Sequence, residues 1–315
     1  MIGASHGSKY AMRSGQSKRF DQSKQSDRSN QPKSNTMCAP DIEYDGISCA
    51  RLNVLVELAR AYNSQASTHD HIQLNDKQHL IDPRAYKQYI VDELTAKIGD
   101  RCDSHKCWSR QEFVHHMEEV AREEYLKYTF RPDSPQGKFQ WLNTHDINNT
   151  MAQYERKYPH FKFFGAVPMD FLDFKDLEIN NYDYAKNHAK GITSLGIVFN
   201  FDTSNQPGSH WVAMFTDLKH GRIYYFDSFA TRPKKSVTEL IKIQHEQMVK
   251  LGHNPDAIAI DHNKVQHQKE GSECGVYSIN FLIRMARGDD FHELCNKPIR
   301  DRKINKCRKT YFSKK

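Results

Sequence analysis

Residues 268–281 read QKEGSECGVYSINF, and this stretch decides how the rest of the sequence is interpreted. From Cys274 onwards the chain is apolar almost all the way round a helix, which predicts a helix buried on most of its sides. A cysteine in the first turn of such a helix has its sulfur at the positive end of the helix dipole, where a thiolate is favoured. Gly275 allows close approach to the backbone, and Gly271 and Ser272 shape the preceding turn. The stretch therefore predicts a reactive thiol at the start of a buried helix.

Two shorter runs earlier in the chain, GSHWVAMF at 208–215 and IYYFDS at 223–228, supply a histidine and an aspartate. Both runs are rich in β-branched and aromatic residues, as strands are. If the two strands pair, His210 at the start of one and Asp227 at the end of the other meet at one sheet edge, facing Cys274. His210 would then take the thiol proton, and Asp227 would fix the tautomer of the imidazole.

Gln268 lies six residues before Cys274 and carries a fourth useful side chain. Its carboxamide can donate a hydrogen bond to an oxyanion that forms beside the Cys274 backbone N–H. A nucleophile, a base, an orienting carboxylate and an amide donor together predict a thiol protease site. The motif favours His210 and Asp227 for two of these roles, although other residues are available: His262 or His267 as the base, and Asp202 or Asp217 as the acid.

Residues 38–130 have the periodicity of a helical arm domain that precedes the catalytic part. One predicted helix begins with Asp82 as its cap and Pro83 in its first turn. Another begins at Ser109, where Glu112 would complete a capping box ahead of Phe113, Met117 and Val120. The first helix of the arm carries an apolar stripe made of Leu52, Leu55, Val56 and Ala59.

After a linker at 131–138, which contains two prolines and a glycine, the periodicity changes. A helix capped by Asp146 is expected first, with an apolar stripe on Ile147, Met151, Tyr154 and Tyr158. Strands are predicted in SLGIVFNF, HWVAMF, RIYYF and AIAI, and a helix in VTELIKIQHEQMVKLG between the last two. Residues 139–315 are thus predicted to form an α+β catalytic domain, a mixed sheet flanked by helices. The helix that begins at Cys274 is expected to be the last.

The order His-Trp, then Phe-Asp-Ser, then Gln and Cys-Gly six residues apart resembles the adenain and ubiquitin-like-protein-specific (SUMO) clan of cysteine proteases. WLNTHDI at 141–147 is similar to the stretch that leads into the catalytic domain of SUMO proteases. The resemblance implies that clan's fold over 139–315 and cleavage after Gly-Gly. It also implies substrate binding by Trp211, which would roof a narrow tunnel, and by Trp141 and Asn143. A tryptophan in a strand is also an ordinary core residue.

Within this clan the chain resembles in particular the polyprotein-processing proteases of African swine fever virus and related large DNA viruses. The likeness lies in FKFFGAVPMDFLDF, GIVFNFDTSNQPGSHWVAMFTDL and IRDRKINKCRKTYF, and in a helical arm that bears GDRCDS. The chain departs from that pattern at Asp227, where the swine fever enzyme has asparagine. The resemblance implies a virion maturation protease of the host cytoplasm (viral factory) and the virion, not secreted. A deconjugase acting on SUMO or ubiquitin conjugates, or an inactive protease fold that only binds, are the alternatives.

Residues 1–37 carry seven basic and two acidic side chains, and so hold +5 of the formal net charge of +7. Their Ser, Gln, Asn and Gly content, with very few apolar residues, predicts a disordered tail. Mobile positive charge suits weak contact with nucleic acid or another anionic surface. A solvated tail without a partner is the alternative.

Seven cysteines, an odd number scattered over a long chain, favour free thiols in a reducing compartment. Cys102, His105 and Cys107 lie close together but lack the paired spacing of a zinc site, so we expect no metal and no cofactor. No run approaches the roughly 18 consecutive apolar residues of a membrane span, and no apolar signal-peptide stretch begins the chain.

Overall fold

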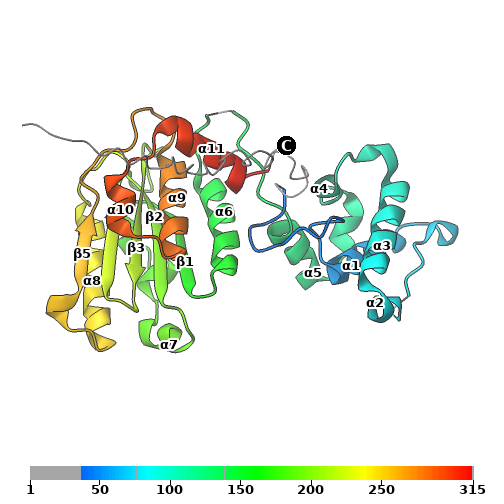
Figure 1. Cartoon of the computed structure of the whole chain (residues 1–315), viewed down its shortest axis with the longest axis horizontal. Coiled ribbons are helices and arrows are strands. Elements are labelled where there is room, and N and C mark those ends of the chain that lie inside the picture. Colours follow the sequence, from blue (N-terminus) through cyan, green and yellow to red (C-terminus); the bar gives the residue numbers. More distant parts are fainter. Residues whose placement is uncertain (1–36, 76, 138, 314–315) are drawn as a thin grey trace, which may run out of the picture. The chain divides into compact units, whose positions relative to one another are not determined.

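The computed structural model describes residues 37–75, 77–137 and 139–313. A five-stranded mixed sheet in the order β1-β2-β3-β4-β5 organises the second part of the chain (Figure 1). β1 pairs in parallel with β2 and β4 with β5, whereas β2, β3 and β4 are antiparallel neighbours. The strands are β1 (Phe161–Val167), β2 (Ser194–Asn200), β3 (Trp211–Asp217), β4 (Arg222–Phe226) and β5 (Ala259–His262).

The predicted mixed sheet is confirmed. The hydrophobic pattern of the sequence does not, however, predict the strand β1. Its run FKFFGAV contains Gly165, which has a positive φ of 93° and lies where the pairing with β2 shifts register. A glycine and an irregular pairing interrupt the alternation by which a strand is recognised in sequence. The tertiary pairing with β2 therefore decides the conformation of this segment.

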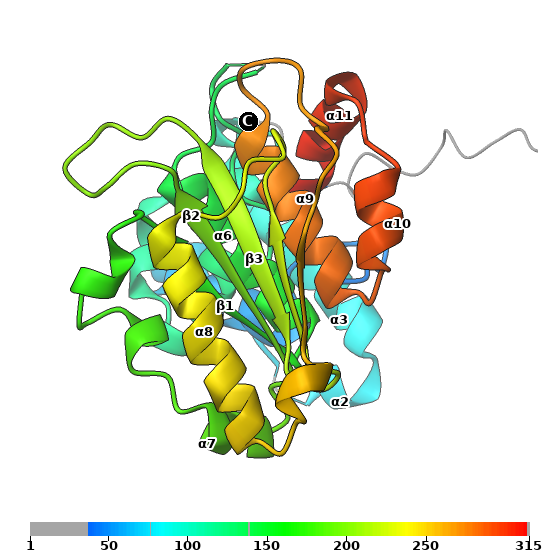
Figure 2. The ribbon, with the colours of Figure 1, turned by 90° about the vertical axis from the view of Figure 1, so that its left-hand side faces the viewer.

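Successive side chains of a strand point to opposite faces of the sheet, so alternate residues pack in two separate apolar layers. Phe215 and Phe226 pack on one face with α6 (Thr144–Lys157) and α9 (Cys274–Ala286). Met214 and Tyr225 pack on the other face, which α8 (Lys235–Lys250) covers (Figure 2). The smaller α7 (Tyr184–Ala189) follows β1 in the chain.

α9 has the burial that its composition predicts, since all of its residues except Asn280 and Arg284 are buried. It is not the last helix, however, and that expectation is wrong. α10 (Phe291–Asn296) and α11 (Asp301–Tyr311) follow it. The run of α11 is dominated by charged side chains, which leaves too sparse an apolar stripe to stand out in the sequence.

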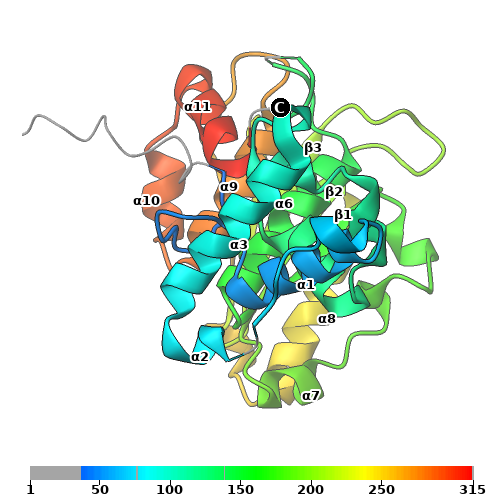
Figure 3. The same ribbon diagram turned by 90° about the vertical axis from the view of Figure 1, so that its right-hand side faces the viewer.

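The helical residues before Phe130 have an apolar cluster of their own. The helices of this part of the chain are α1 (Leu52–Asn63), α2 (Gln78–Ile81), α3 (Pro83–Ile98), α4 (His105–Trp108) and α5 (Glu119–Glu123). Of these, α1 packs on α3 (Figure 3). The predicted start of α3 is confirmed, because the Asp82 carboxylate accepts a hydrogen bond from the Ala85 N–H at 2.9 Å. The division at 130 and 139 into arm, linker and catalytic domain stays a prediction.

Three details of the helices differ from expectation. In α1 the buried residues are Val54, Leu55, Leu58, Ala59 and Ala61, so the predicted stripe is rotated, and Leu52 and Val56 are only half-buried. The continuous helix predicted from Ser109 is replaced by a 3-10 turn, Glu112–His116, and the short α5, because the backbone at Met117 is extended. In α6 the cap is Asn143, with Asp146 as the reciprocal partner of a capping box.

The cysteines of the arm correct the expectation of free thiols. Cys38 is disulfide-bonded to Cys49, and Cys102 to Cys107. Sequence spacing alone does not show that the turns of the arm bring these sulfurs together. Neither Cys102 nor Cys107 is therefore available as a metal ligand. Among the described residues, no group of three or more His, Cys, Asp or Glu side chains could hold a metal ion.

Within the segment predicted as a linker, 131–138, residues 131–134 are held by Lys106 and Ser313. The Ser313 N–H donates to the Pro132 carbonyl at 2.9 Å, and the Ser134 N–H donates to the Ser313 carbonyl at 3.1 Å. The Lys106 ammonium donates to the Arg131 carbonyl at 2.7 Å and also to the Ser313 hydroxyl. Residues that are distant in the sequence therefore meet here.

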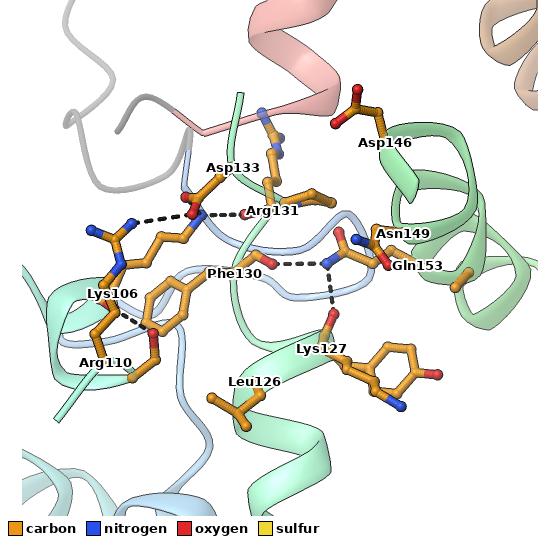
Figure 4. A pocket seen from close by; sticks show the side chains of 14 residues that line it. Lys106, Arg110, Leu126, Lys127, Phe130, Arg131, Asp133, Asp146, Asn149 and Gln153 are labelled. Atoms are coloured by element: carbon orange, nitrogen blue, oxygen red, sulfur yellow. Dashed lines mark hydrogen bonds and ion pairs between the residues drawn. The ribbon is translucent and has the colours of Figure 1, made fainter. Parts of the chain in front are cut away.

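A hollow of about 420 Å³ lies beside this segment (Figure 4). Asp133 forms ion pairs in it with Lys106 at 2.7 Å and with Arg110 at 3.1 Å. Gln153 of α6 donates to the Lys127 and Phe130 carbonyls, both at 2.8 Å. The polar groups that line this hollow are thus largely committed to one another.

Within the described part of the chain, no helix combines the length and apolar character needed to cross a bilayer.

Candidate active site

His210 and Asp227 lie at the same end of the sheet. β3 and β4 are antiparallel with Ala213 opposite Phe226, so the residue before β3 and the residue after β4 are brought together. The His210 Nε2 lies 2.6 Å from the Asp227 Oδ1, a hydrogen-bonding distance. The His210 side chain is 12% exposed and that of Asp227 is fully buried. The pair is therefore largely shielded from water, which strengthens the electrostatic attraction between its members.

The Asp227 carboxylate is held by its own turn. Its Oδ1 also accepts a hydrogen bond from the Phe229 N–H at 2.9 Å, and its Oδ2 accepts from the Thr231 N–H at 3.2 Å and from the Thr231 hydroxyl. The Asn263 side chain pairs with the Asp227 backbone, accepting from its N–H at 2.9 Å and donating to its carbonyl at 2.7 Å. This network fixes the carboxylate in one orientation toward His210.

The electrostatics of the pair favour the charged form of both groups. Burial alone would raise the pKa of Asp227, but hydrogen bonds from His210 and Thr231 outweigh it and lower that pKa. Burial alone would lower the pKa of His210, but the hydrogen bond to Asp227 and the influence of the nearby Cys274 side chain outweigh it and raise that pKa to about 9. An imidazolium is therefore the stable state of His210 at neutral pH.

Cys274 is the first residue of α9 and is 2% exposed. Its side chain lies close enough to His210 to contribute to the raised pKa of that imidazole, and His210 contacts Asp227 through Nε2. The structure therefore brings three of the four predicted catalytic side chains into one series of neighbouring groups. A sulfur at this position also lies beside the unpaired N–H groups of the first helical turn.

Gln268 is fully buried and lies on the segment that leads to Cys274. Its Oε1 accepts a hydrogen bond from the Ser228 hydroxyl at 2.6 Å, and its Nε2 donates to the Glu270 carbonyl at 2.7 Å. Ser228 follows Asp227 directly, so the amide is tied to the turn that carries the carboxylate. A primary amide has two N–H groups, and the contact with Glu270 uses one of them.

Trp211 lies beside the segment that contains Trp141 and Asn143. The Trp211 indole N–H donates to the Leu142 carbonyl at 2.8 Å, and the Trp211 side chain is buried in the core. The Leu142 side chain covers Gly275, where an added Cβ would lie 3.0 Å from the Leu142 Cβ. A side chain at position 275 would therefore push this segment away from the first turn of α9.

Trp141 and Asn143 are placed differently from Trp211. Trp141 is 45% exposed, which is a large apolar area left open to water on a folded domain. Asn143 is exposed and caps α6, where its side chain accepts a hydrogen bond from the Asp146 N–H at 2.9 Å. The cap accounts for Asn143 structurally, whereas nothing in the packing accounts for the exposure of Trp141.

The alternative acids and bases lie elsewhere. Asp217 contacts His220 at 2.8 Å. His262 contacts Lys264 at 2.9 Å, and His267 is buried with its Nε2 3.0 Å from the Cys295 carbonyl. Asp202 is half-buried, with its N–H bonded to Asn200. The observed partner of the Asp227 carboxylate is His210.

The other two free thiols among the described residues are Cys295 and Cys307. Burial is the main cause that raises the pKa of Cys295 to about 12, and it also raises the pKa of Cys307. Both therefore remain protonated at neutral pH and are weak nucleophiles. Of the three free thiols, it is Cys274 that contributes to the raised pKa of His210.

The sequence patterns do not identify Thr231 and Asn263, which hold Asp227 in place. Thr231 lies four residues beyond Asp227. A turn after the aspartate brings residues at this spacing close enough for the Thr231 hydroxyl to bind the carboxylate. Asn263 follows β5, the strand that runs parallel to β4, so both strands end at the same sheet edge. That second signal becomes readable only once the strand order is known.

Comparison with known proteins agrees with this architecture. Residues 193–315 match the Ulp1 protease family, C-terminal catalytic domain. The thiol protease R355 of Acanthamoeba polyphaga mimivirus is 36% identical over 285 residues, which cover 88% of this chain and 93% of that protein. A cysteine protease of African swine fever virus (isolate Tick/Malawi/Lil 20-1/1983) is 28% identical over 225 residues, 64% of this chain and 80% of that protein.

A solved structure supports the same fold. The crystal structure of a protease from African swine fever virus superimposes with a TM-score of 0.63 at 20% identity, covering 89% of this chain and 96% of that one. The expected fold class, a protease core of this type with a mixed sheet flanked by helices, is confirmed. The similarity of the mimivirus protease extends along nearly the whole chain, and on these grounds the chain belongs to the Ulp1 family of cysteine proteases.

Proposed function

We propose that the protein is an endopeptidase that cleaves viral structural polyproteins after Gly-Gly during virion maturation. The observation that carries the proposal is the series Asp227, His210 and Cys274, in which His210 Nε2 lies 2.6 Å from Asp227 Oδ1 and the sulfur stands on the first residue of α9, near enough to His210 to help raise its pKa. A thiol protease needs a nucleophile, a base and an orienting group in contact with one another. The series provides these three groups on a strand start, a strand end and a helix tip.

In the proposed mechanism the thiol proton has already passed to His210, whose raised pKa favours the imidazolium, and the Cys274 thiolate of this ion pair attacks the carbonyl carbon of the scissile peptide bond. The tetrahedral oxyanion receives hydrogen bonds from the Cys274 N–H and from the second N–H of the Gln268 amide. The imidazolium returns its proton to the leaving amine, and the acyl group stays on the sulfur as a thioester. Water activated by His210 then hydrolyses the thioester and regenerates the thiol, while Asp227 keeps the imidazole in place.

Cleavage after glycine fits the crowding around the sulfur. Leu142 contacts Gly275 closely, and its carbonyl is fixed by the Trp211 indole, so the wall next to Cys274 is rigid. Trp141, the neighbour of Leu142, keeps an exposed ring. We propose that Trp211 and Trp141 border the channel for the residues before the scissile bond, with Asn143 fixing the end of this wall. Such a channel would reject side chains larger than hydrogen.

Purified protein incubated with a panel of short peptides tests this proposal. Peptides with Gly-Gly before the scissile bond should be cleaved after the second glycine. Matched peptides with Ala in place of either glycine should be cleaved at least about 10-fold more slowly, since a hydrophobic wall discriminates one methyl group by about that factor. Equal cleavage of the Ala and Gly peptides would contradict the channel, and cleavage at other sequences would contradict the substrate class.

A deconjugase is the second candidate function, and a specific observation favours it. The catalytic part matches the family of Ulp1, and relatives from African swine fever virus at 25% to 28% identity bear the name SUMO-1 cysteine protease. A deconjugase needs a surface that recognises a folded modifier, whereas a polyprotein protease reads an extended segment. Comparison of kcat/KM for a SUMO fusion and for its isolated C-terminal Gly-Gly-x peptide separates the two. A large preference for the fusion favours the deconjugase.

The proposed setting is the host cytoplasm (viral factory) and the virion, where structural polyproteins are assembled. The basic residues 1–37 are proposed to make weak contact with nucleic acid, but apart from Met37 they lie outside the described residues. Quantitative proteomics of purified virions tests the location. Detection of the protein at the level of a contaminating host enzyme would contradict packaging.

Asp227→Asn is expected to reduce kcat/KM only modestly, by about 10-fold to 100-fold. The amide oxygen can still accept the His210 N–H, and the Thr231 hydroxyl can accept from the amide nitrogen, so the imidazole keeps its orientation. The pH profile should change more clearly. Because the carboxylate helps to raise the pKa of His210 to about 9, wild-type activity should fall as the pH rises through about 9.

In the Asp227→Asn variant this alkaline limb should move to lower pH, since the imidazolium loses its anionic partner. Initial rates measured from about pH 5 to about pH 10 with one peptide check both points. Thr231→Val, which keeps the carboxylate charge, serves as the matched control and should shift the limb less. An unchanged limb in Asp227→Asn would show that the carboxylate does not set the His210 pKa.

Gln268→Ala is expected to lower kcat by about 10² to 10³, the usual effect of removing one oxyanion donor. KM should change little, because the oxyanion exists only after attack. The variant also loses the contacts with Ser228 and Glu270, so its thermal melting must be measured beside its kinetics. Ser228→Ala removes the Gln268 anchor but leaves the amide, and it should be less severe. An equal loss in both variants would indicate that Gln268 acts through packing alone.

A further inference from the structure

α11 presents one face to the segment that leads to the candidate nucleophile. Asp301, Asn305 and Arg308 are four and three residues apart, so they lie on the same side of the helix. Each of them contacts the segment Lys269–Glu273, which ends directly before Cys274. All three polar side chains of this face are thus used to hold one short segment.

Asp301 fixes the beginning of the segment. Its Oδ2 accepts hydrogen bonds from the Lys269 N–H at 2.8 Å and from the Glu270 N–H at 3.0 Å. Its Oδ1 accepts from the Tyr277 hydroxyl of α9 at 2.9 Å. Asp301 is 8% exposed, and a buried carboxylate that accepts three hydrogen bonds is strongly held. It ties the segment and the helix of the nucleophile to one point.

Asn305 fixes the end of the segment through Glu273. The Asn305 amide donates to the Glu273 Oε1 at 2.8 Å. The same carboxylate accepts from the Ser272 N–H and from the Ser272 hydroxyl, both at 2.9 Å. Glu273 is 3% exposed and immediately precedes Cys274. Glu273 takes no part in the catalytic series. Its hydrogen bond with Asn305 of α11 accounts for a buried carboxylate at this position.

Arg308 completes the face. Its Nη2 donates to the Ser272 carbonyl at 3.2 Å and its Nε donates to the Asn305 Oδ1 at 3.0 Å. The guanidinium is almost fully buried, and its Nη1 has no hydrogen-bond partner among the described residues. The buried guanidinium therefore holds the Ser272 carbonyl and the Asn305 amide, although one of its N–H-bearing nitrogens has no partner among the described residues.

The far end of α11 is anchored as well. The Arg131 guanidinium donates to the Lys309 carbonyl at 3.2 Å, and Ser313, just beyond the helix, pairs with Pro132 and Ser134. This end of α11 is consequently fixed by contacts that do not involve the segment before Cys274. Such a support can set the position of that segment instead of following it.

We propose that Asp301, Asn305 and Arg308 are positioning residues, which hold Lys269–Glu273 so that the Cys274 sulfur faces His210. The inference rests on the proposed catalytic role of Cys274 and goes beyond it by making α11 part of the catalytic apparatus. Each residue acts through its contacts with the segment. Loosening the segment should slow the reaction of the sulfur without removing any reacting group.

The test compares Asn305→Ala and Arg308→Lys with Lys303→Ala, whose exposed side chain lies on the opposite face of α11. The first readout is the rate of Cys274 alkylation by iodoacetamide from about pH 5 to about pH 9, followed by mass mapping that separates Cys274 from the other thiols. Asn305→Ala and Arg308→Lys should each react about 10-fold to 100-fold more slowly near neutral pH than wild type. Lys303→Ala should match wild type.

The second readout is the split of kcat and KM for a Gly-Gly peptide, with thermal melting alongside. Positioning predicts a lower kcat, a KM within about two-fold and a nearly unchanged melting temperature. Arg308→Lys keeps the charge but cannot make both contacts of the fork, so full activity in that variant would contradict the proposal. Unchanged Cys274 alkylation in both α11 variants would also overturn it.

Alkylation needs no peptide, and this keeps the two ideas separate. If wild type cleaves no Gly-Gly peptide while Cys274 alkylation still depends on Asn305 and Arg308, the substrate assignment fails and the positioning role stands. If the peptide is cleaved and Cys274 alkylation is the same in all variants, the positioning role fails and the proposed function stands.

Discussion

Cys274→Ala is expected to abolish peptide cleavage, with a loss of at least about 10⁴-fold in kcat, because it removes the only atom proposed to bond to the substrate. The remaining groups can still bind the peptide and an oxyanion, so a small residual rate over the uncatalysed reaction is compatible with the mechanism. The side chain is 2% exposed and alanine lacks only the sulfur, so the fold should persist with a loss of stability on the order of 1 kcal/mol. Cleavage of a Gly-Gly peptide and thermal melting are the two measurements.

Cys295→Ala is the matched control for this variant. Cys295 is also a buried free cysteine on a helix, but burial raises its pKa to about 12. It should keep nearly full activity, since its thiol is protonated and has no part in the proposed chemistry. Retention of more than about one per cent of wild-type kcat in Cys274→Ala would contradict the assignment of the nucleophile, because nucleophile removal ordinarily costs far more.

His210→Ala is expected to cause the second largest loss, about 10³-fold to 10⁴-fold in kcat. The Cys274 thiol then has no base to take its proton, and the leaving amine has no acid to supply one. Asp227 keeps its hydrogen bonds from Thr231 and Phe229, so the carboxylate remains in place without a cation. Steady-state kinetics near neutral pH test the loss, with His262→Ala as a control, whose side chain contacts Lys264 instead.

The stability of the His210→Ala variant should depend on pH in a defined direction. The folded-state pKa of His210, about 9, lies above its ordinary value of 6.5. The imidazolium therefore stabilises the fold fully below pH 6.5, and this contribution is lost as the pH rises through about 9. The melting temperatures of wild type and variant should differ most at about pH 6 and converge near about pH 10. A constant difference over this range would show that the raised pKa does not exist.

The sequence identifies the proposed catalytic residues better than the residues that position them. Cys274, His210 and Asp227 are recognisable because each sits at a strand or helix end that composition marks, and strand pairing alone then brings two of them together. Asp301, Asn305 and Arg308 have no such mark, because a polar helix near the end of the chain has no pattern that reveals what it contacts. Their role depends on tertiary packing against the segment before Cys274.

The distinction between local and through-space interactions also explains which other features of the fold were predicted wrongly. β1 depends on its pairing with β2, and the disulfides of the arm depend on turns that bring Cys38 to Cys49 and Cys102 to Cys107. In each case the deciding interaction joins residues through space. The start of α3 is predicted correctly because Asp82 and Pro83 act within one turn of the helix.

Mass mapping of the adduct formed by a peptide vinyl sulfone that ends in Gly-Gly tests the central claim most directly. The probe reacts fastest with a thiolate beside a bound Gly-Gly segment, so the place and rate of its adduct report the nucleophile, its activation and the substrate channel together. The account predicts one adduct, on Cys274, that forms rapidly in wild type and barely forms in His210→Ala. An adduct on Cys295 or Cys307, or equal labelling of Cys274 without the imidazole, would contradict it.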